Sequence, residues 1–235
     1  MNNELIALVD EDDKIIGYGD EEEVHKNGTL HQAVTLLLVT SHWGNDIILL
    51  DRLEDLWTSS CHTHIKEGEQ LLDTVIRIAR ETLNRDIPEN DYTSDYRSLY
   101  KIGIFQYCKK SGSCIDREIN HVFLYWLHDE PLKEELVFMP HIWECNEENW
   151  NKKDQSMHWL DAFDLYDLRE WMVTKPALFD TRFFMVFGLF LREWMLGDTI
   201  FWAIWSDEWD EIMCKKNAEI SVREIATCSS ECCKS

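Results

Sequence analysis

The chain has 235 residues, enough for one domain with an extension but short for two full domains of roughly 100 to 200 residues each. It carries 23 Lys and Arg against 45 Asp and Glu, a net charge of −22. This charge disfavours nucleic acid and anionic membranes as partners. A phosphorylated substrate would need a metal or basic side chains that reverse the charge locally. The eleven tryptophans predict a large aromatic core, an apolar pocket, or both.

The cysteines and the N-terminus bear on where the protein is found. Eight cysteines are irregularly spaced, and no CxxC…CxxC pair occurs among them, so neither a disulfide framework nor a thiolate zinc site is expected. The sequence starts without the basic and apolar segments of a secretory signal. We therefore expect reduced thiols and a cytoplasmic location.

The N-terminal part predicts two antiparallel strand pairs. The first joins Leu5–Val9 to Lys14–Tyr18 through a run of four acidic residues. The second joins Gln32–Thr40 to Asp46–Leu50 through a Gly-Asn turn, a sequence that suits a hairpin.

The middle of the chain predicts one strong helix and another strand pair. Apolar residues recur at helical spacing over Glu69–Arg85, and Pro88 ends the pattern. Ser98–Cys108 and Ile119–His128 alternate as strands do, and Lys109–Arg117 is predicted to be the loop between them.

The remainder predicts a short strand at Met157–Leu160 and then three helices, at Ala162–Val173, Phe179–Met195 and Thr199–Cys214. The apolar run inside the second helix is far shorter than the roughly 20 residues that cross a bilayer, so no membrane span is expected. Strands around one helix, followed by more helices, indicate an α+β or layered α/β/α domain.

Imidazoles gather around the central helix. His25 and His31 flank an Asn-Gly turn that can fold them towards one point. His62 and His64 would share a face if their segment is extended.

Carboxylates accompany these histidines. Side chains at four-residue steps from Glu69 to Glu81 form an acidic helix ridge, and Glu118 shares a strand face with Asn120. Imidazoles combined with carboxylates suit Mg²⁺, Mn²⁺ or Zn²⁺. The alternative is that the histidines are ordinary surface or core residues and the ridge is a solvated helix face.

Three segments resemble one branch of the Nudix superfamily. Residues 24–34 read VHKNGTLHQAV, residues 56–60 read LWTSS and residues 118–124 read EINHVFL. They are similar to the motifs of type I isopentenyl-diphosphate isomerases and of isomerase-like Nudix hydrolases, over about residues 4 to 165. The resemblance implies an α/β/α Nudix-like sandwich with a mixed sheet over residues 1–165. A helical extension over 166–216 would pack on it and could pair two copies into a homodimer, and 217–235 would be a flexible tail.

The resemblance also implies a site for a diphosphate and a divalent metal, Mg²⁺ or Mn²⁺ with Zn²⁺ as a further option. The positions that match metal ligands of the family are His25, His31, His64 and Glu118, with Glu69 and Glu81 from the Nudix box. Arg77 matches the arginine that orients the box carboxylates. The candidates for acid–base catalysis are His62, Glu81 and Glu118, and those for substrate binding are Arg52, Lys66, Asn120 and Trp57.

Several positions depart from the family pattern. Thr63, Ile78, Thr82 and Asn84 replace two glycines and two glutamates of the Nudix box. His62 stands at the catalytic cysteine of the isomerases and Asn120 at their catalytic glutamate. We therefore expect hydrolysis of an isoprenoid diphosphate. The alternatives are an isomerase-like or cyclase-like rearrangement of such a diphosphate, and a catalytically retired binding or scaffold protein.

Overall fold

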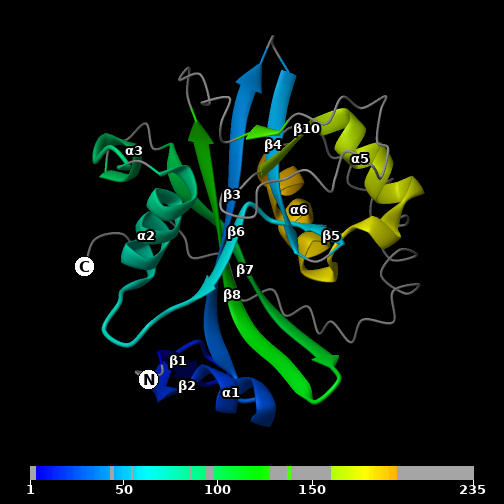
Figure 1. Cartoon of the computed structure of the whole chain (residues 1–235). Helices are drawn as coiled ribbons and strands as arrows, with labels where there is room; N and C mark the ends of the chain where they lie inside the picture. The colour runs from blue at the N-terminus through cyan, green and yellow to red at the C-terminus, as the bar shows by residue number, and fades with distance from the viewer. Residues whose placement is uncertain are drawn as a thin grey trace.

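The computed structural model describes residues 4–42, 45–53, 55–84, 86–93, 98–127, 137–138 and 160–194. Among them one mixed sheet of ten strands is covered by helices on both faces (Figure 1). The predicted α+β class, with an α/β/α arrangement, is confirmed.

The elements follow the chain in a simple order. The strands are β1 Leu5–Val9, β2 Ile15–Asp20, β3 His31–His42, β4 Asn45–Leu53, β5 Leu56–Thr58, β6 Cys61–His64, β7 Leu99–Ser111, β8 Cys114–Leu127, β9 Val137–Phe138 and β10 Leu160–Asp164. The helices are α1 Glu21–Asn27, α2 Leu71–Leu83, α3 Asn90–Thr93, α5 Leu165–Thr174 and α6 Thr181–Trp194, with a 3₁₀ turn η1 at Pro176–Leu178.

Strand β3 is a central strand of the sheet. It pairs in parallel with β8 and antiparallel with β4 and β6, and β8 pairs antiparallel with β7. The parallel register sets His31 opposite Glu118, and the β6 register sets Ala33 opposite His64. Histidines and carboxylates that are far apart in the sequence are thus brought to one end of the sheet.

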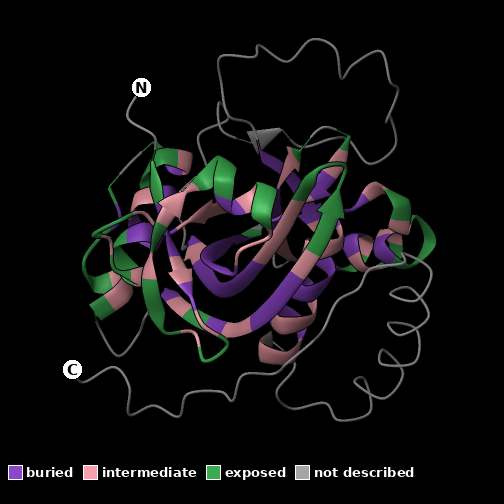
Figure 2. Cartoon of the chain, turned by 90° about the horizontal axis from the view of Figure 1, so that it is seen from below, coloured by how far each residue is buried: buried purple, intermediate pink, exposed green. Residues whose placement is uncertain are grey.

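Alternation along β3 divides the interior into two cores. Val34, Leu36 and Leu38 face α2, whereas Leu37 and Val39 face α5 and α6. Both sets are fully buried, and exposed residues concentrate on outer helix faces and strand ends (Figure 2). The strands therefore have apolar residues on both faces, as a sheet between two helical layers requires.

Helix α2 and the first two strand pairs confirm the predictions from periodicity. Helix α2 begins at Leu71, two residues after the predicted start, and ends before Asn84, which adopts the left-handed conformation with φ 49°. The pairs β1–β2 and β3–β4 form as expected.

The predicted loop at Lys109–Arg117 is wrong. Strand β7 continues to Ser111 and β8 starts at Cys114, so a two-residue turn joins them, with Gly112 at φ 62°. The tip of this hairpin extends beyond the packed body of the sheet, so its residues lack the apolar alternation by which a buried strand is recognised. As a result, Asp116 lies on a strand next to Glu118.

The strand after the acidic region is also shifted from its prediction. Strand β10 spans Leu160–Asp164, where a helix from Ala162 was predicted, because this segment pairs with β4. Asp164 then caps α5 by accepting a hydrogen bond from Tyr166 N at 2.9 Å. Residues 157–159 lie outside the described part of the chain.

Helix α6 packs closely on β7. A Cβ at Gly103 would lie 2.8 Å from Leu189 Cδ2, so a larger residue there would require the Leu189 side chain to shift. Three of the four phenylalanines of α6 form a stacked row inside the core, Phe183, Phe187 and Phe190. In the described part of the chain, none of the helices has the length and apolar character to cross a bilayer. The predicted helix Thr199–Cys214 and tail 217–235 lie outside the described residues.

Candidate metal centre

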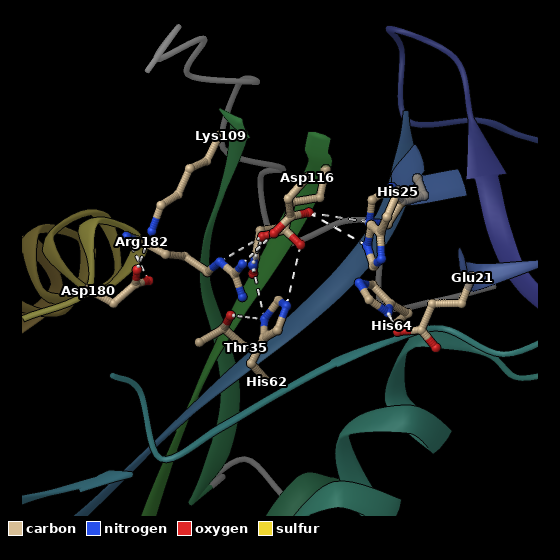
Figure 3. Close-up of polar contacts among 12 residues, drawn as sticks. Glu21, His25, Thr35, His62, His64, Lys109, Asp116, Asp180 and Arg182 are labelled. Carbon is tan, nitrogen blue, oxygen red and sulfur yellow. Dashed lines mark hydrogen bonds and ion pairs between the residues drawn. The ribbon is translucent and has the colours of Figure 1, made fainter. Parts of the chain in front are cut away.

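Three imidazoles and a carboxylate converge at the end of the sheet where α1 meets β3, β6 and β8 (Figure 3). One ligand atom from each of His25, His31, His64 and Asp116 lies within 4.8 Å of the others. The three imidazole centroids are 4.8–5.0 Å apart. This is the spacing of side chains arranged around a single ion.

Helix α1, which was not predicted, positions His25. Asp20 caps its start by accepting from Glu23 N at 3.2 Å, and Gly28 ends it at φ 64°. A Cβ on Gly28 would lie 2.9 Å from Ile115 Cγ2, so the helix end rests directly on β8. Glycine at this position thus allows His25 to approach Asp116.

Hydrogen bonds behind the imidazoles fix their orientation. His31 Nδ1 donates to the Thr29 carbonyl at 2.9 Å, and His64 Nδ1 lies 3.2 Å from the Glu21 carboxylate. In both rings the Nε2 atom is left for a ligand, which is how metal-binding histidines are usually held.

Several atoms that face the centre have no other partner. In the described structure, His25 Nε2, His31 Nε2 and Asp116 Oδ1 are buried without a hydrogen bond. Asp116 Oδ1 lies 3.6 Å from His31 Nε2 and 3.9 Å from His25 Nε2. Buried polar atoms normally have partners, so these three point to a cation between them.

The protonation of the cluster also suits a cation. Burial, and then the neighbouring His64, lowers the pKa of His31 to about 4, and the same two causes lower the pKa of His25. These imidazoles are neutral at pH 7, as metal ligation requires. Burial, and then the charge of Glu118, raises the pKa of Asp116 to about 6, so its carboxylate is mostly ionised at pH 7.

A second group, His62, His64 and Glu118, overlaps the first. His62 Nε2 lies 3.4 Å from Glu118 Oε2, and Thr35 Oγ1 lies 3.1 Å from His62 Nδ1. Asn120 Nδ2 donates to Glu118 Oε1 at 2.9 Å. Burial, and then the charge of Arg182, lowers the pKa of His62 to about 4. The imidazole is thus a neutral group that is held on both sides.

Arg182 of α6 enters the site from the helical layer (Figure 3). Its Nη2 lies 2.6 Å from Asp116 Oδ2 and its Nε 3.0 Å from Glu118 Oε1, while the guanidinium lies over the Tyr107 ring. Burial alone would raise the pKa of Glu118, but the charge of Arg182 and then the neighbouring His62 hold it well below its ordinary value.

The structure unites three of the predicted metal ligands and separates the others. His25, His31 and His64 share one group, and Glu118 belongs to the adjoining one. Glu69 instead accepts hydrogen bonds from Arg77 at 2.7 and 3.0 Å, and Glu81 lies 3.5 Å from the same guanidinium. Neither box carboxylate belongs to the groups found among the described residues.

Of the predicted substrate-binding residues, only Asn120 lies in this site. Arg52 lies 3.7 Å from Asp55 and over the Trp57 ring, and Lys66 Nζ donates to Glu4 at 2.7 Å. Trp57 is buried in the core, where its ring packs on aromatic residues and its Nε1 donates to Asp161 at 2.8 Å.

Cys61, next to the position of the isomerase cysteine, points away from the centre. It is buried against α2, with Sγ 3.0 Å from Thr82 Oγ1. Burial raises the pKa of this thiol to about 12. The thiol is therefore protonated at pH 7 and unsuited to nucleophilic or acid–base work.

Sequence reasoning missed Glu21, Asp116 and Arg182. Each had a signal: an acidic run after the capping Asp20 for Glu21, the two-residue strand period from Glu118 for Asp116, and a cation at the start of an apolar helix for Arg182. None of these signals states that the three side chains lie around the same group of imidazoles.

Comparison with known proteins shows the family of the chain. No family model matches the chain. Isopentenyl-diphosphate Delta-isomerase 2 of Photorhabdus laumondii is 30% identical over 137 residues, which cover 55% of this chain and 71% of that protein. An enzyme of the same name from Aromatoleum aromaticum is 30% identical over 50% of this chain and 60% of its own length.

Two further comparisons add to this. An uncharacterized Nudix hydrolase of Clostridium acetobutylicum is 28% identical over 53% of this chain and 60% of its own length, so the match spans about three-fifths of some relatives. A crystal structure of C. elegans Ap4A hydrolase is similar at 14% identity and a TM-score of 0.37, over 68% of this chain and 97% of that one. On the sequence matches, the chain belongs to the Nudix superfamily, in the branch related to isopentenyl-diphosphate isomerases.

Proposed function

We propose that the protein is a metal-dependent Nudix-type enzyme that hydrolyses an isoprenoid diphosphate. The observation that carries the proposal is the convergence of His25, His31, His64 and Asp116 with ligand atoms that have no other partner in the described structure. The choice of a prenyl diphosphate rests on the relatives named isopentenyl-diphosphate isomerases.

The donor set bears on which metal would bind. Three imidazoles and one carboxylate favour Mn²⁺ or Zn²⁺ over Mg²⁺, which prefers oxygen ligands and water. When bound, such an ion supplies a positive charge that polarises diphosphate oxygens. It would also supply the local charge reversal that a chain of net charge −22 needs to receive an anion.

His62 is the residue that we assign to proton transfer. Thr35 contacts its Nδ1 and Glu118 faces its Nε2, so the ring has a fixed orientation beside the centre. Its pKa of about 4 leaves the imidazole neutral at pH 7, and because the Asn120 amide nitrogen and the Thr35 hydroxyl face Nδ1, that nitrogen is the one that would accept a proton. The ionised Glu118 would stabilise the imidazolium that results.

The side chains favour hydrolysis over isomerisation. Cys61, beside the position of the isomerase cysteine, is buried against α2 and turned away from the centre. Asn120 stands at the position that matches the catalytic glutamate of the isomerases, and an amide does not act as an acid or a base near pH 7. Water is then the remaining nucleophile for the diphosphate.

The test is turnover of the full chain with Mn²⁺, Zn²⁺ or Mg²⁺ and a series of prenyl and nucleoside diphosphates. Free phosphate and the organic products are followed together by colorimetry and mass spectrometry. We expect prenyl phosphate or prenol with release of phosphate or pyrophosphate, and at least about a hundredfold loss in His64→Ala.

Two outcomes would contradict the proposal. An isomerised prenyl diphosphate without phosphate release would indicate a rearrangement instead. No turnover together with no metal binding by calorimetry would indicate a retired scaffold, a role in keeping with the pairing of Glu69 and Glu81 to Arg77.

A further inference from the structure

We infer that Arg182 is a positioning residue that holds one oxygen of each site carboxylate, leaves the other oxygen facing the imidazoles, and gives the metal-loaded centre the positive charge that recruits an anion. This inference rests on the proposed function, because it assigns a role to a residue beside the metal. It concerns a side chain of α6, beyond the segment in which the family motifs lie.

The four carboxylate oxygens are divided in a regular way. Arg182 Nη2 donates to Asp116 Oδ2 at 2.6 Å, and Arg182 Nε forms an ion pair with Glu118 Oε1 at 3.0 Å without hydrogen-bond geometry, whereas Asp116 Oδ1 and Glu118 Oε2 are buried without a hydrogen bond in the described structure. These two remaining oxygens are the ones that face imidazole nitrogens, at 3.6 Å from His31 and 3.4 Å from His62. Each carboxylate therefore offers a single oxygen to the centre.

Charge arithmetic shows what the arginine contributes. The charged groups at the centre are the buried Glu118 and the partly buried Asp116 and Arg182, which sum to −2 + 1 = −1. A divalent ion raises this sum to +1, and without Arg182 it would be 0. Glu21 is half exposed and so is screened by water, and Lys109 and Asp180 pair with each other at 3.2 Å.

The fold holds Arg182 in place by several independent contacts. Asp180 accepts from Arg182 N at 3.1 Å, and Asp180 N donates to the Trp57 carbonyl at 2.8 Å, which ties the start of α6 to β5. The guanidinium is 5.0 Å from the Tyr107 ring. Removing a guanidinium from water costs free energy, even when several contacts hold it. This cost is explained if Arg182 has a role in the site.

The experiment compares Arg182→Gln and Arg182→Lys with a matched control. Arg117→Gln removes the same charge from the neighbouring position on β8, where the side chain turns outward to Glu11 at 2.6 Å. Mn²⁺ affinity is measured by calorimetry. Binding of labelled inorganic pyrophosphate is measured by equilibrium dialysis at fixed free Mn²⁺, and thermal unfolding reports folding.

In Arg182→Gln we expect Mn²⁺ to bind within about tenfold of the wild type, because the loss of a positioning contact weakens binding while the loss of a neighbouring positive charge strengthens it. Pyrophosphate affinity should fall by at least about tenfold, because one nearby charge is lost from a partly buried site. Arg182→Lys should keep pyrophosphate affinity within about threefold, and Arg117→Gln should match the wild type. Pyrophosphate affinity in Arg182→Gln equal to that of the wild type would overturn the inference, and so would loss of Mn²⁺ binding in both Arg182 variants.

A further measurement applies if Arg182→Gln does not fold. Pyrophosphate affinity of the wild type, measured from 50 to 300 mM NaCl, should change by less than about threefold, because a buried charge is weakly screened. A fall of more than about thirtyfold would assign recruitment to surface cations and overturn the inference. A wild type that binds neither Mn²⁺ nor pyrophosphate would contradict the proposed function itself.

Discussion

Three buried polar atoms at the centre lack hydrogen-bond partners in the described structure, and this lowers the stability of the metal-free protein. His25 Nε2, His31 Nε2 and Asp116 Oδ1 each forgo a hydrogen bond, which costs about 1–3 kcal/mol per atom. A cation bound between them would recover that free energy and add its own. Metal binding should therefore stabilise the fold.

The first prediction concerns Asp116. Asp116→Asn removes a ligand charge while keeping the shape, so Mn²⁺ affinity measured by calorimetry should fall by at least about tenfold. Glu81→Gln should change the affinity by less than about threefold, because Glu81 is exposed and paired with Arg77. If Glu81→Gln lowered the Mn²⁺ affinity more than Asp116→Asn did, the ion would lie on α2, beside the Nudix box glutamates.

The second prediction concerns pH and Glu69. Hydrogen bonds from Arg77 hold the pKa of Glu69 below its ordinary value of 4.5. A lowered folded-state pKa stabilises the protein above pH 4.5, and this stabilisation is lost as the pH falls through the folded value. In EDTA, Glu69→Gln should lower the free energy of unfolding by about 1 kcal/mol at pH 7. The difference from the wild type, measured by urea unfolding, should shrink towards pH 3; a constant difference would show that the ion pair does not contribute.

Local elements decided which parts of the site could be predicted from the sequence. Apolar residues recur at helical spacing along α2, so this helix can be recognised in the sequence. Helix α1 has seven residues and one buried side chain, Val24, which are too few to show such a spacing. The tip of the hairpin of β7 and β8 also lacks a recognisable apolar pattern. The strands there, and the place of Asp116 on them, were therefore not predicted. Histidines were predicted because their residue type suggests chemistry, and Arg182 was missed because only packing brings α6 to the sheet.

The third prediction concerns the end of α1. Gly28 and Gly112 both have φ above 60°, but a Cβ would contact Ile115 only at Gly28 and meets open space at Gly112. Both alanine variants should lose about 1–2 kcal/mol of unfolding free energy through backbone strain. Only Gly28→Ala should also weaken Mn²⁺ binding, by at least about tenfold, because it separates His25 from Asp116. Equal Mn²⁺ affinities in the two variants would show that the contact does not position the ligand.

The arrangement of the whole molecule reconciles a net charge of −22 with the anionic substrate that we propose. Parallel pairing of β3 with β8 brings His31 beside Glu118, a contact across 87 residues that no local pattern specifies. The helical layer then adds Arg182 to the carboxylates. Acidity elsewhere on the surface can favour solubility while the centre, once loaded, carries the opposite sign.

The most direct test is a crystal structure of the full chain soaked with Mn²⁺ or Zn²⁺, with an anomalous difference map recorded at the absorption edge of the metal. A single strong peak bounded by His25, His31, His64 and Asp116, with Zn–N distances of about 2.0–2.1 Å in the zinc form, is the expected result. A peak beside Glu69 and Glu81, or no peak at either place, would contradict the assignment of the metal centre.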